Sequence, residues 1–148
     1  MAHIVAVSVS EKKGMRKTNV NEVILEVESG IKGDAHAGSW HRQVSLLAQE
    51  SIVKMQNLGL DVHAGDFAEN LTTEGINLVS LSVGTKLQIG ESTLLEVTQI
   101  GKVCHERCTI YYQAGDCVMP KEGIFVRVLT GGRLVPQDKI TVLGKIKL

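Results

Sequence analysis

Three cysteines lie close together in the second half of the chain, beside an imidazole and a cation. Cys104, Cys108 and Cys117 share one short segment, and His105 and Arg107 lie between the first two. Nearby cations lower the pKa of a thiol and favour the thiolate, which is the form that attacks electrophiles and binds soft metals. The segment therefore predicts thiolate chemistry or a metal site.

A structural zinc site is an alternative for the same residues. Cys104, Cys108, Cys117 and His105 would supply four ligands, although their spacing is not that of two paired zinc knuckles. A buried and inert thiol is the ordinary state of any single cysteine. All of these interpretations stay open at this point.

A second candidate site lies at 33–38, where glycines bracket His36, and Arg42 follows closely. Glycines let the backbone approach a ligand, and the guanidinium of Arg42 suits a phosphate or a carboxylate. The plainer interpretation is a polar turn in which Asp34 caps its own backbone. The segment lacks the Gly-Lys-Ser/Thr ending of a phosphate-binding loop.

A third polar segment, 65–71, holds Glu69 and Asn70 between apolar residues. Either polar side chain could satisfy loop backbone groups or meet a polar heterocycle, and the structural role is favoured. Phe67 and Leu71 are predicted to be core residues. The cations lie mainly in predicted loops, where a solvated surface is the default and an anion pocket is the alternative. They are Lys12, Lys13, Arg16, Lys17, Arg42, Lys102, Arg107, Lys121, Arg127 and Arg133.

The elements that must position these residues are mostly strands. Strands are predicted at 4–10, 20–27, 43–47, 78–81, 124–129 and 139–143, with a hairpin formed by 85–89 and 93–100. Helical spacing of apolar residues predicts a helix over 49–58, ended by Gly59. Many short strands and few helices predict a mainly β fold built on a closed β-barrel.

Composition narrows the class of protein. The chain has 148 residues, a net charge of +0 and 3% aromatic residues. This favours a single domain over 1–148, and it argues against a polyanion or single-stranded nucleic acid as partner. No apolar run reaches the roughly 18 residues of a membrane helix, and no signal peptide is evident, so we expect a cytoplasmic protein.

Taken in order, these segments resemble the MOSC domain, which is named after the C-terminal domain of molybdenum cofactor sulfurase. The resemblance is to a small stand-alone bacterial type. The matching pieces are 10–14, 33–38, 42–46, 65–71, 83–90, 97–104, 131–132 with Asp138, and the segment around the cysteines with 115–120.

The resemblance implies a strand-rich barrel that binds molybdenum cofactor (molybdopterin). It implies that one cysteine carries sulfur or ligates molybdenum, and this cysteine maps onto Cys104 or Cys108. Lys13, Arg16 and Arg42 would hold the pterin phosphate, with Arg107 as a further cofactor-binding cation. His36 and Asn70 would contact the heterocycle or orient the thiol.

The same resemblance implies partners. They are proteins of molybdenum cofactor biosynthesis or molybdoenzymes, and a pyridoxal-phosphate-dependent cysteine desulfurase as sulfur donor. Other family members hold the cofactor and reduce N-hydroxylated compounds, and such a reductase would need electrons from a partner. Whether this chain is a carrier or an enzyme stays open.

Overall fold

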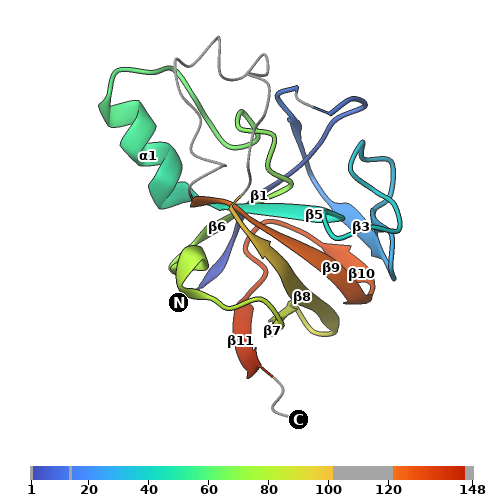
Figure 1. Ribbon diagram of the computed structural model, residues 1–148. Helices are drawn as coiled ribbons and strands as arrows, with labels where there is room; N and C mark the ends of the chain where they lie inside the picture. The colour runs from blue at the N-terminus through green and yellow to red at the C-terminus, as the bar shows by residue number, and fades with distance from the viewer. Residues whose placement is uncertain (1, 14, 102–121, 146–148) are drawn as a thin grey trace.

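The computed structural model describes residues 2–13, 15–101 and 122–145, and these form a mainly β fold with one α-helix (Figure 1). The elements in chain order are β1 (His3–Val9), β2 (Thr18–Val20), β3 (Val23–Glu26), β4 (Gly30–Ile31), β5 (Val44–Ala48), α1 (Gln49–Asn57), β6 (Leu71–Glu74), the 3-10 helix η1 (Leu78–Ser80), β7 (Thr85–Ile89), β8 (Thr93–Ile100), β9 (Ile124–Thr130), β10 (Gly132–Leu134) and β11 (Ile140–Lys145).

One large sheet dominates the fold. Its strand order is β11-β7-β8-β9-β5-β6-β1-β2, and β10, β3 and β4 form a smaller sheet. Neighbouring strands are antiparallel except β5 and β6, which run parallel because α1 carries the chain from one to the other. Figure 1 shows the large sheet curling on itself into a half-barrel.

The closed barrel expected from the sequence forms only in part. The outermost strands of the large sheet, β11 and β2, do not pair with each other. The C-terminal half of β1 pairs with β2, and its N-terminal end meets the segment just before β11 at an isolated bridge between His3 and Lys139 and at a backbone hydrogen bond from Gln137 to Ile4. The sheet is therefore not closed by continuous strand pairing, because the free edge of β1 pairs with β2 at one end and contacts the segment before β11 at the other.

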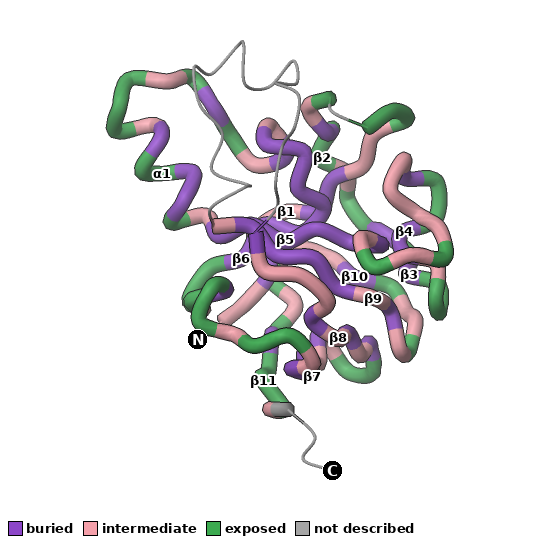
Figure 2. Tube along the Cα trace, in the orientation of Figure 1, coloured by how far each residue is buried: buried purple, intermediate pink, exposed green. Residues whose placement is uncertain are grey.

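The core lies inside the curl. Side chains alternate between buried and part-buried along β7 and β8, as a sheet with one covered face requires. Figure 2 shows buried residues running along β5 and β9, near the centre of the sheet. A second apolar cluster lies under α1 and includes Leu47, Ile52, Met55, Phe67 and Phe125.

Most sequence expectations for the elements are confirmed. The helix, the hairpin of β7 and β8, and the first and last strands occur close to their predicted positions. Phe67 and Leu71 are core residues, with 1% and 0% exposure. The strand predicted over 20–27 is instead divided between β2 and β3, and 78–81 is mainly a 3-10 turn. No helix among the described residues is long and apolar enough to span a membrane.

Candidate functional site

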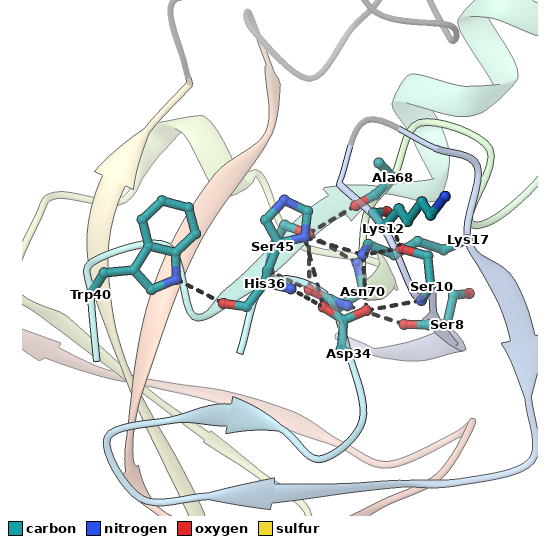
Figure 3. Close-up of polar contacts among 10 residues, drawn as sticks. All are labelled: Ser8, Ser10, Lys12, Lys17, Asp34, His36, Trp40, Ser45, Ala68 and Asn70. Atoms are coloured by element: carbon teal, nitrogen blue, oxygen red, sulfur yellow. Dashed lines mark hydrogen bonds and ion pairs between the residues drawn. The ribbon is translucent and has the colours of Figure 1, made fainter. Parts of the chain in front are cut away.

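A buried ion pair joins the loop before β2 to the loop after β4 (Figure 3). Lys17 Nζ lies 2.9 Å from Asp34 Oδ1, and both side chains have 0% exposure. The backbone N–H of Ser10 donates to Oδ1 and that of His36 donates to Oδ2, each over 3.0 Å. Lys17 is thus not one of the solvated cations expected from the sequence, because Asp34 balances its charge in the interior.

Asp34 is held in its ionised form. Burial raises the pKa of this carboxyl, but hydrogen bonds from His36 and Lys17 and the positive charge of Lys17 lower it, and the net pKa is well below the ordinary value. The bond from the His36 N–H also confirms the plainer prediction that Asp34 caps its own backbone.

His36 lies at the edge of this pair, with a side chain that is 13% exposed. Its Nδ1 is 3.2 Å from Lys17 Nζ and 3.7 Å from Asp34 Oδ2. The Trp40 indole N–H donates to the His36 carbonyl over 2.7 Å, and the two rings are stacked with centroids 6.3 Å apart. Trp40 therefore holds His36 in two ways: it bonds to the His36 backbone, and its ring stacks on the imidazole.

Lys13 reaches the same indole from another loop. Its Nζ lies 4.2 Å from the centroid of the Trp40 ring, in a cation–π contact. The exposed ammonium has no carboxylate partner among the residues that the structure describes. The sequence analysis did not single out Trp40, although it is the chain's single tryptophan and adjoins the His41-Arg42 pair.

Arg42 likewise has no carboxylate partner in the described ranges. Its Nε donates to Gln99 Oε1 over 3.1 Å, and its Cζ lies 5.2 Å from the centroid of the Phe125 ring. Both partners are neutral, so they orient the half-buried guanidinium without cancelling its charge. Such a group suits a phosphate, which a guanidinium binds through two hydrogen bonds.

Gln99 links Arg42 to the start of the cysteine segment. Its Nε2 donates to the Gly101 carbonyl over 2.7 Å, and the Gly101 N–H donates to the Gly123 carbonyl. Cys104, Arg107, Cys108 and the other residues of 102–121 lie outside the described residues, so the predictions made for them remain predictions. Among the described residues, no group of three or more His, Cys, Asp and Glu could hold a metal ion.

Asn70 is wholly buried and ties three strands together. Its Oδ1 accepts from the Ser45 N–H over 3.0 Å and from the Ser45 hydroxyl over 3.2 Å, and its Nδ2 donates to the Ser8 carbonyl over 3.1 Å. These bonds join β1 and β5 to the start of β6. The structure therefore places this predicted ligand contact within the framework of the sheet.

Glu69 is buried beside Asn70 and closes the loop that precedes β6. It accepts hydrogen bonds from the N–H groups of Gly65 and Phe67 and from the Thr72 hydroxyl. Burial raises the pKa of Glu69 to about 7, although these three donors favour the carboxylate. Glu69 thus satisfies loop backbone groups, as the structural interpretation expects.

Gly65 allows this loop to pack against Lys17. A Cβ at Gly65 would lie 2.6 Å from the Lys17 carbonyl oxygen, and its φ of +90° is a region that favours glycine. The nearby cation Arg16, predicted to hold a phosphate, forms an ion pair with Asp66 over 2.8 Å. The charge of Arg16 is therefore balanced within the protein.

A cavity of about 510 Å³ opens beside Trp40, over the outer face of β8 and β9. Its cation, Arg127, is already bound by two carboxylates, with Nε 2.7 Å from Glu96 and Nη1 3.4 Å from Glu28. This cavity therefore offers less to an anion than the environment of Arg42 does.

The candidate site consists of two groups, which we name separately. The buried framework comprises Lys17, Asp34, Glu69 and Asn70, whose polar atoms bond to the protein. The rim comprises Lys13, Trp40 and Arg42, whose two cations have no carboxylate partner in the described parts of the chain. His36 lies between them and contacts both groups.

Solved structures share this fold over nearly the whole chain. The YuaD protein from Bacillus subtilis is 17% identical, with a TM-score of 0.80, over 99% of this chain and 98% of that one. YiiM from Geobacillus stearothermophilus is 21% identical, with a TM-score of 0.73, over 97% and 75%. YiiM from Escherichia coli is 20% identical, with a TM-score of 0.71, over 100% and 72%. A comparison with curated proteins gives no match.

The family is shown by the sequence itself. A model of the MOSC domain matches residues 33–141. The match begins at the glycine-bracketed segment 33–38, includes 65–71, and continues through the cysteines to β11. It therefore contains most of the buried framework, two of the three rim residues, and all three thiols, and the chain belongs to the MOSC domain family.

Proposed function

We propose that this MOSC domain binds molybdenum cofactor, or the pterin on which it is built, and handles sulfur or metal through Cys104 or Cys108. The observation that carries this proposal is the state of Arg42. Its guanidinium is half-buried and oriented by Gln99 and Phe125, and it has no carboxylate partner among the described residues. A charge kept in this state favours an anionic ligand.

The rim fits the phosphate and ring system of such a ligand. Arg42 supplies a planar fork for phosphate oxygens, and Lys13 supplies a second positive charge above Trp40. Arg16 and Asn70 already bond to the protein, through Asp66 and Ser45. We therefore assign the phosphate to Arg42 and Lys13, the ring contact to His36, and further cofactor binding to Arg107.

The thiol role rests on the family and on the placement of Gln99. Gln99 bonds to both Arg42 and Gly101, the last described residue before the cysteine segment. When bound, the cofactor supplies a molybdenum centre that a thiolate can ligate. We assign this ligand, or a carried sulfur atom, to Cys104 or Cys108, with a pyridoxal-phosphate-dependent desulfurase as sulfur donor and cofactor-biosynthesis or molybdoenzyme proteins as partners.

Purification from two hosts tests this function. The protein is isolated gently from a host that makes molybdenum cofactor and from one in which cofactor synthesis is blocked, and it is analysed by native mass spectrometry and metal analysis. We expect bound pterin or a cysteine persulfide from the first host, with molybdenum or persulfide lost in Cys104→Ser or in Cys108→Ser. Absence of both pterin and persulfide from wild-type protein overturns the proposal.

The same preparations distinguish the alternatives. One tightly held zinc ion, with a melting temperature that drops on chelation, indicates a structural zinc module built on Cys104, Cys108, Cys117 and His105. Cofactor-dependent reduction of an N-hydroxylated base, lost in one of the cysteine variants, indicates the reductase component. A fold that survives chelation and carries pterin without reductase activity indicates a carrier.

A further inference from the structure

The Lys17 ammonium lies within hydrogen-bond distance of Ser10, Asp34 and His36 (Figure 3). Its Nζ lies 2.9 Å from Ser10 Oγ, 2.9 Å from Asp34 Oδ1 and 3.2 Å from His36 Nδ1. An ammonium group only donates hydrogen bonds, so each of these three atoms must accept.

The Ser10 hydroxyl agrees with this direction. Its hydrogen is directed at the Lys12 carbonyl, 2.9 Å away, so its lone pairs face Lys17. Lys17 thus donates to the Ser10 hydroxyl, which in turn donates to the Lys12 carbonyl. The buried Asp34 carboxylate neutralises Lys17 and so maintains the donor at the centre of the group.

The contact with His36 then decides where the imidazole carries its hydrogen. Nδ1 lies 3.2 Å from Lys17 Nζ and 3.7 Å from Asp34 Oδ2. The second distance is too long for a hydrogen bond, so the first contact dominates. An Nδ1–H would face the hydrogens of Lys17, and an imidazolium would add a second positive charge there.

We propose that Lys17 and Asp34 are positioning residues that fix His36 as the neutral tautomer with its hydrogen on Nε2. Whatever Nε2 meets, it therefore meets as a hydrogen-bond donor and not as a metal ligand or a base. The ligand class that suits this atom has an acceptor there, such as a carbonyl oxygen, an oxyanion or a ring nitrogen. Only the identity of that ligand rests on the proposed function.

Nitrogen NMR of the wild-type protein tests the tautomer directly. Long-range ¹H–¹⁵N spectra of uniformly ¹⁵N-labelled protein near neutral pH separate protonated from unprotonated ring nitrogens. His36 is assigned among the five histidines as the ring whose signals are absent in His36→Asn. We expect a pyridine-type Nδ1 and a pyrrole-type Nε2. A protonated Nδ1, either as the other tautomer or as imidazolium, overturns the proposal.

Variants at position 17 test what fixes the tautomer. Lys17→Met removes the donor, and we expect the hydrogen to move to Nδ1, facing Asp34, or His36 to become charged. Lys17→Arg restores a donor-only group and should restore the Nε2–H form, and Ser10→Ala should leave it unchanged. An unaltered spectrum in folded Lys17→Met overturns the role of Lys17, and if that variant does not fold, the wild-type spectrum still decides the tautomer.

This readout is separate from the proposed function. Nε2–H protein that never carries pterin supports the tautomer and contradicts cofactor binding. Pterin-bearing protein with a protonated Nδ1 supports cofactor binding and contradicts the tautomer.

Discussion

The buried framework and the rim both contain positively charged side chains, but these side chains have different partners. In the framework, Lys17 and Asp34 neutralise each other with no exposure, and Asn70 bonds to Ser45 and Ser8. In the rim, Lys13 and Arg42 contact only a ring, or a ring and an amide, in the described part of the chain. The polar groups of the framework therefore stabilise the fold, and the positive charges of the rim can bind an anion.

The same difference is seen within the short segment 34–42, where one residue belongs to the framework and another to the rim. Asp34 and Arg42 are eight positions apart, yet Asp34 is buried and paired, whereas Arg42 is half-buried and has no opposite charge among the residues that the structure describes. The family match covers both residues and does not distinguish their roles. Burial and the partners among the described residues show that Asp34 belongs to the folded interior, whereas the charge of Arg42 suits an anion.

The largest expected effect comes from breaking the buried pair. Asp34→Ala leaves the Lys17 ammonium in the interior without its counter-charge, and we expect a loss of about 3–5 kcal/mol of unfolding free energy, measured by urea denaturation. The matched control is Glu22→Ala, which breaks an exposed pair with Arg133 and should cost less than about 1 kcal/mol. Equal losses in the two variants would contradict the distinction between framework and surface.

The next effect is a pH dependence due to Glu69. Burial raises its pKa to about 7 from an ordinary 4.5, so the folded protein keeps a proton that the unfolded chain releases. The unfolding free energy should therefore fall as pH rises from about 4.5 to about 7, by up to roughly 3 kcal/mol. Urea denaturation of Glu69→Gln across this range should show a flatter profile than wild type.

The pKa shift of Asp34 has the opposite sign to that of Glu69, so the two carboxyl groups can be compared within one protein. Its pKa is lowered in the folded protein, so its contribution to stability is present above the ordinary value of 3.8 and is lost as pH falls below it. The two carboxyl groups thus act in separate pH windows. A Glu69→Gln protein whose profile between pH 4.5 and 7 matches wild type would show that another group titrates there.

The smallest effects concern the rim and involve binding more than stability. Arg42→Gln should weaken the affinity for inorganic pyrophosphate roughly tenfold to a hundredfold, as expected for loss of a charge-assisted hydrogen bond. Lys13→Gln should have a smaller effect because Lys13 is exposed. The fluorescence of Trp40, the chain's single tryptophan, reports the titration from within the rim. An unchanged affinity for pyrophosphate in Arg42→Gln would contradict anion binding by Arg42.

The sequence predicts the regular parts of this fold well because they depend on local pattern. The hairpin of β7 and β8 shows alternation on both sides of a glycine turn, and the helix shows apolar residues at helical spacing. The division between β2 and β3 depends instead on their separate partners, β1 and β10. Closure of the sheet similarly depends on how β1 divides its edge, and no local pattern encodes this.

The candidate site is predicted less completely, for a related reason. Residue type and flanking glycines predict His36 and Arg42, and the structure places His36 against Trp40 and Arg42 against Gln99 and Phe125. Lys17 is missed because its partner Asp34 is seventeen positions away, and a lone lysine in a loop is usually solvated. The role of Asn70 likewise depends on Ser8 and Ser45, which are distant in sequence.

Retention of pterin by arginine variants tests the central claim most directly. Wild type, Arg42→Gln and Arg127→Gln are purified in parallel from a cofactor-producing host, and bound pterin is measured per protein chain. Arg127 is the matched control because Glu96 and Glu28 already bind it. We predict that Arg42→Gln retains roughly a tenth or less of the wild-type pterin, and that Arg127→Gln retains it fully. Full retention by Arg42→Gln, or equal loss in both variants, would contradict cofactor binding at the rim.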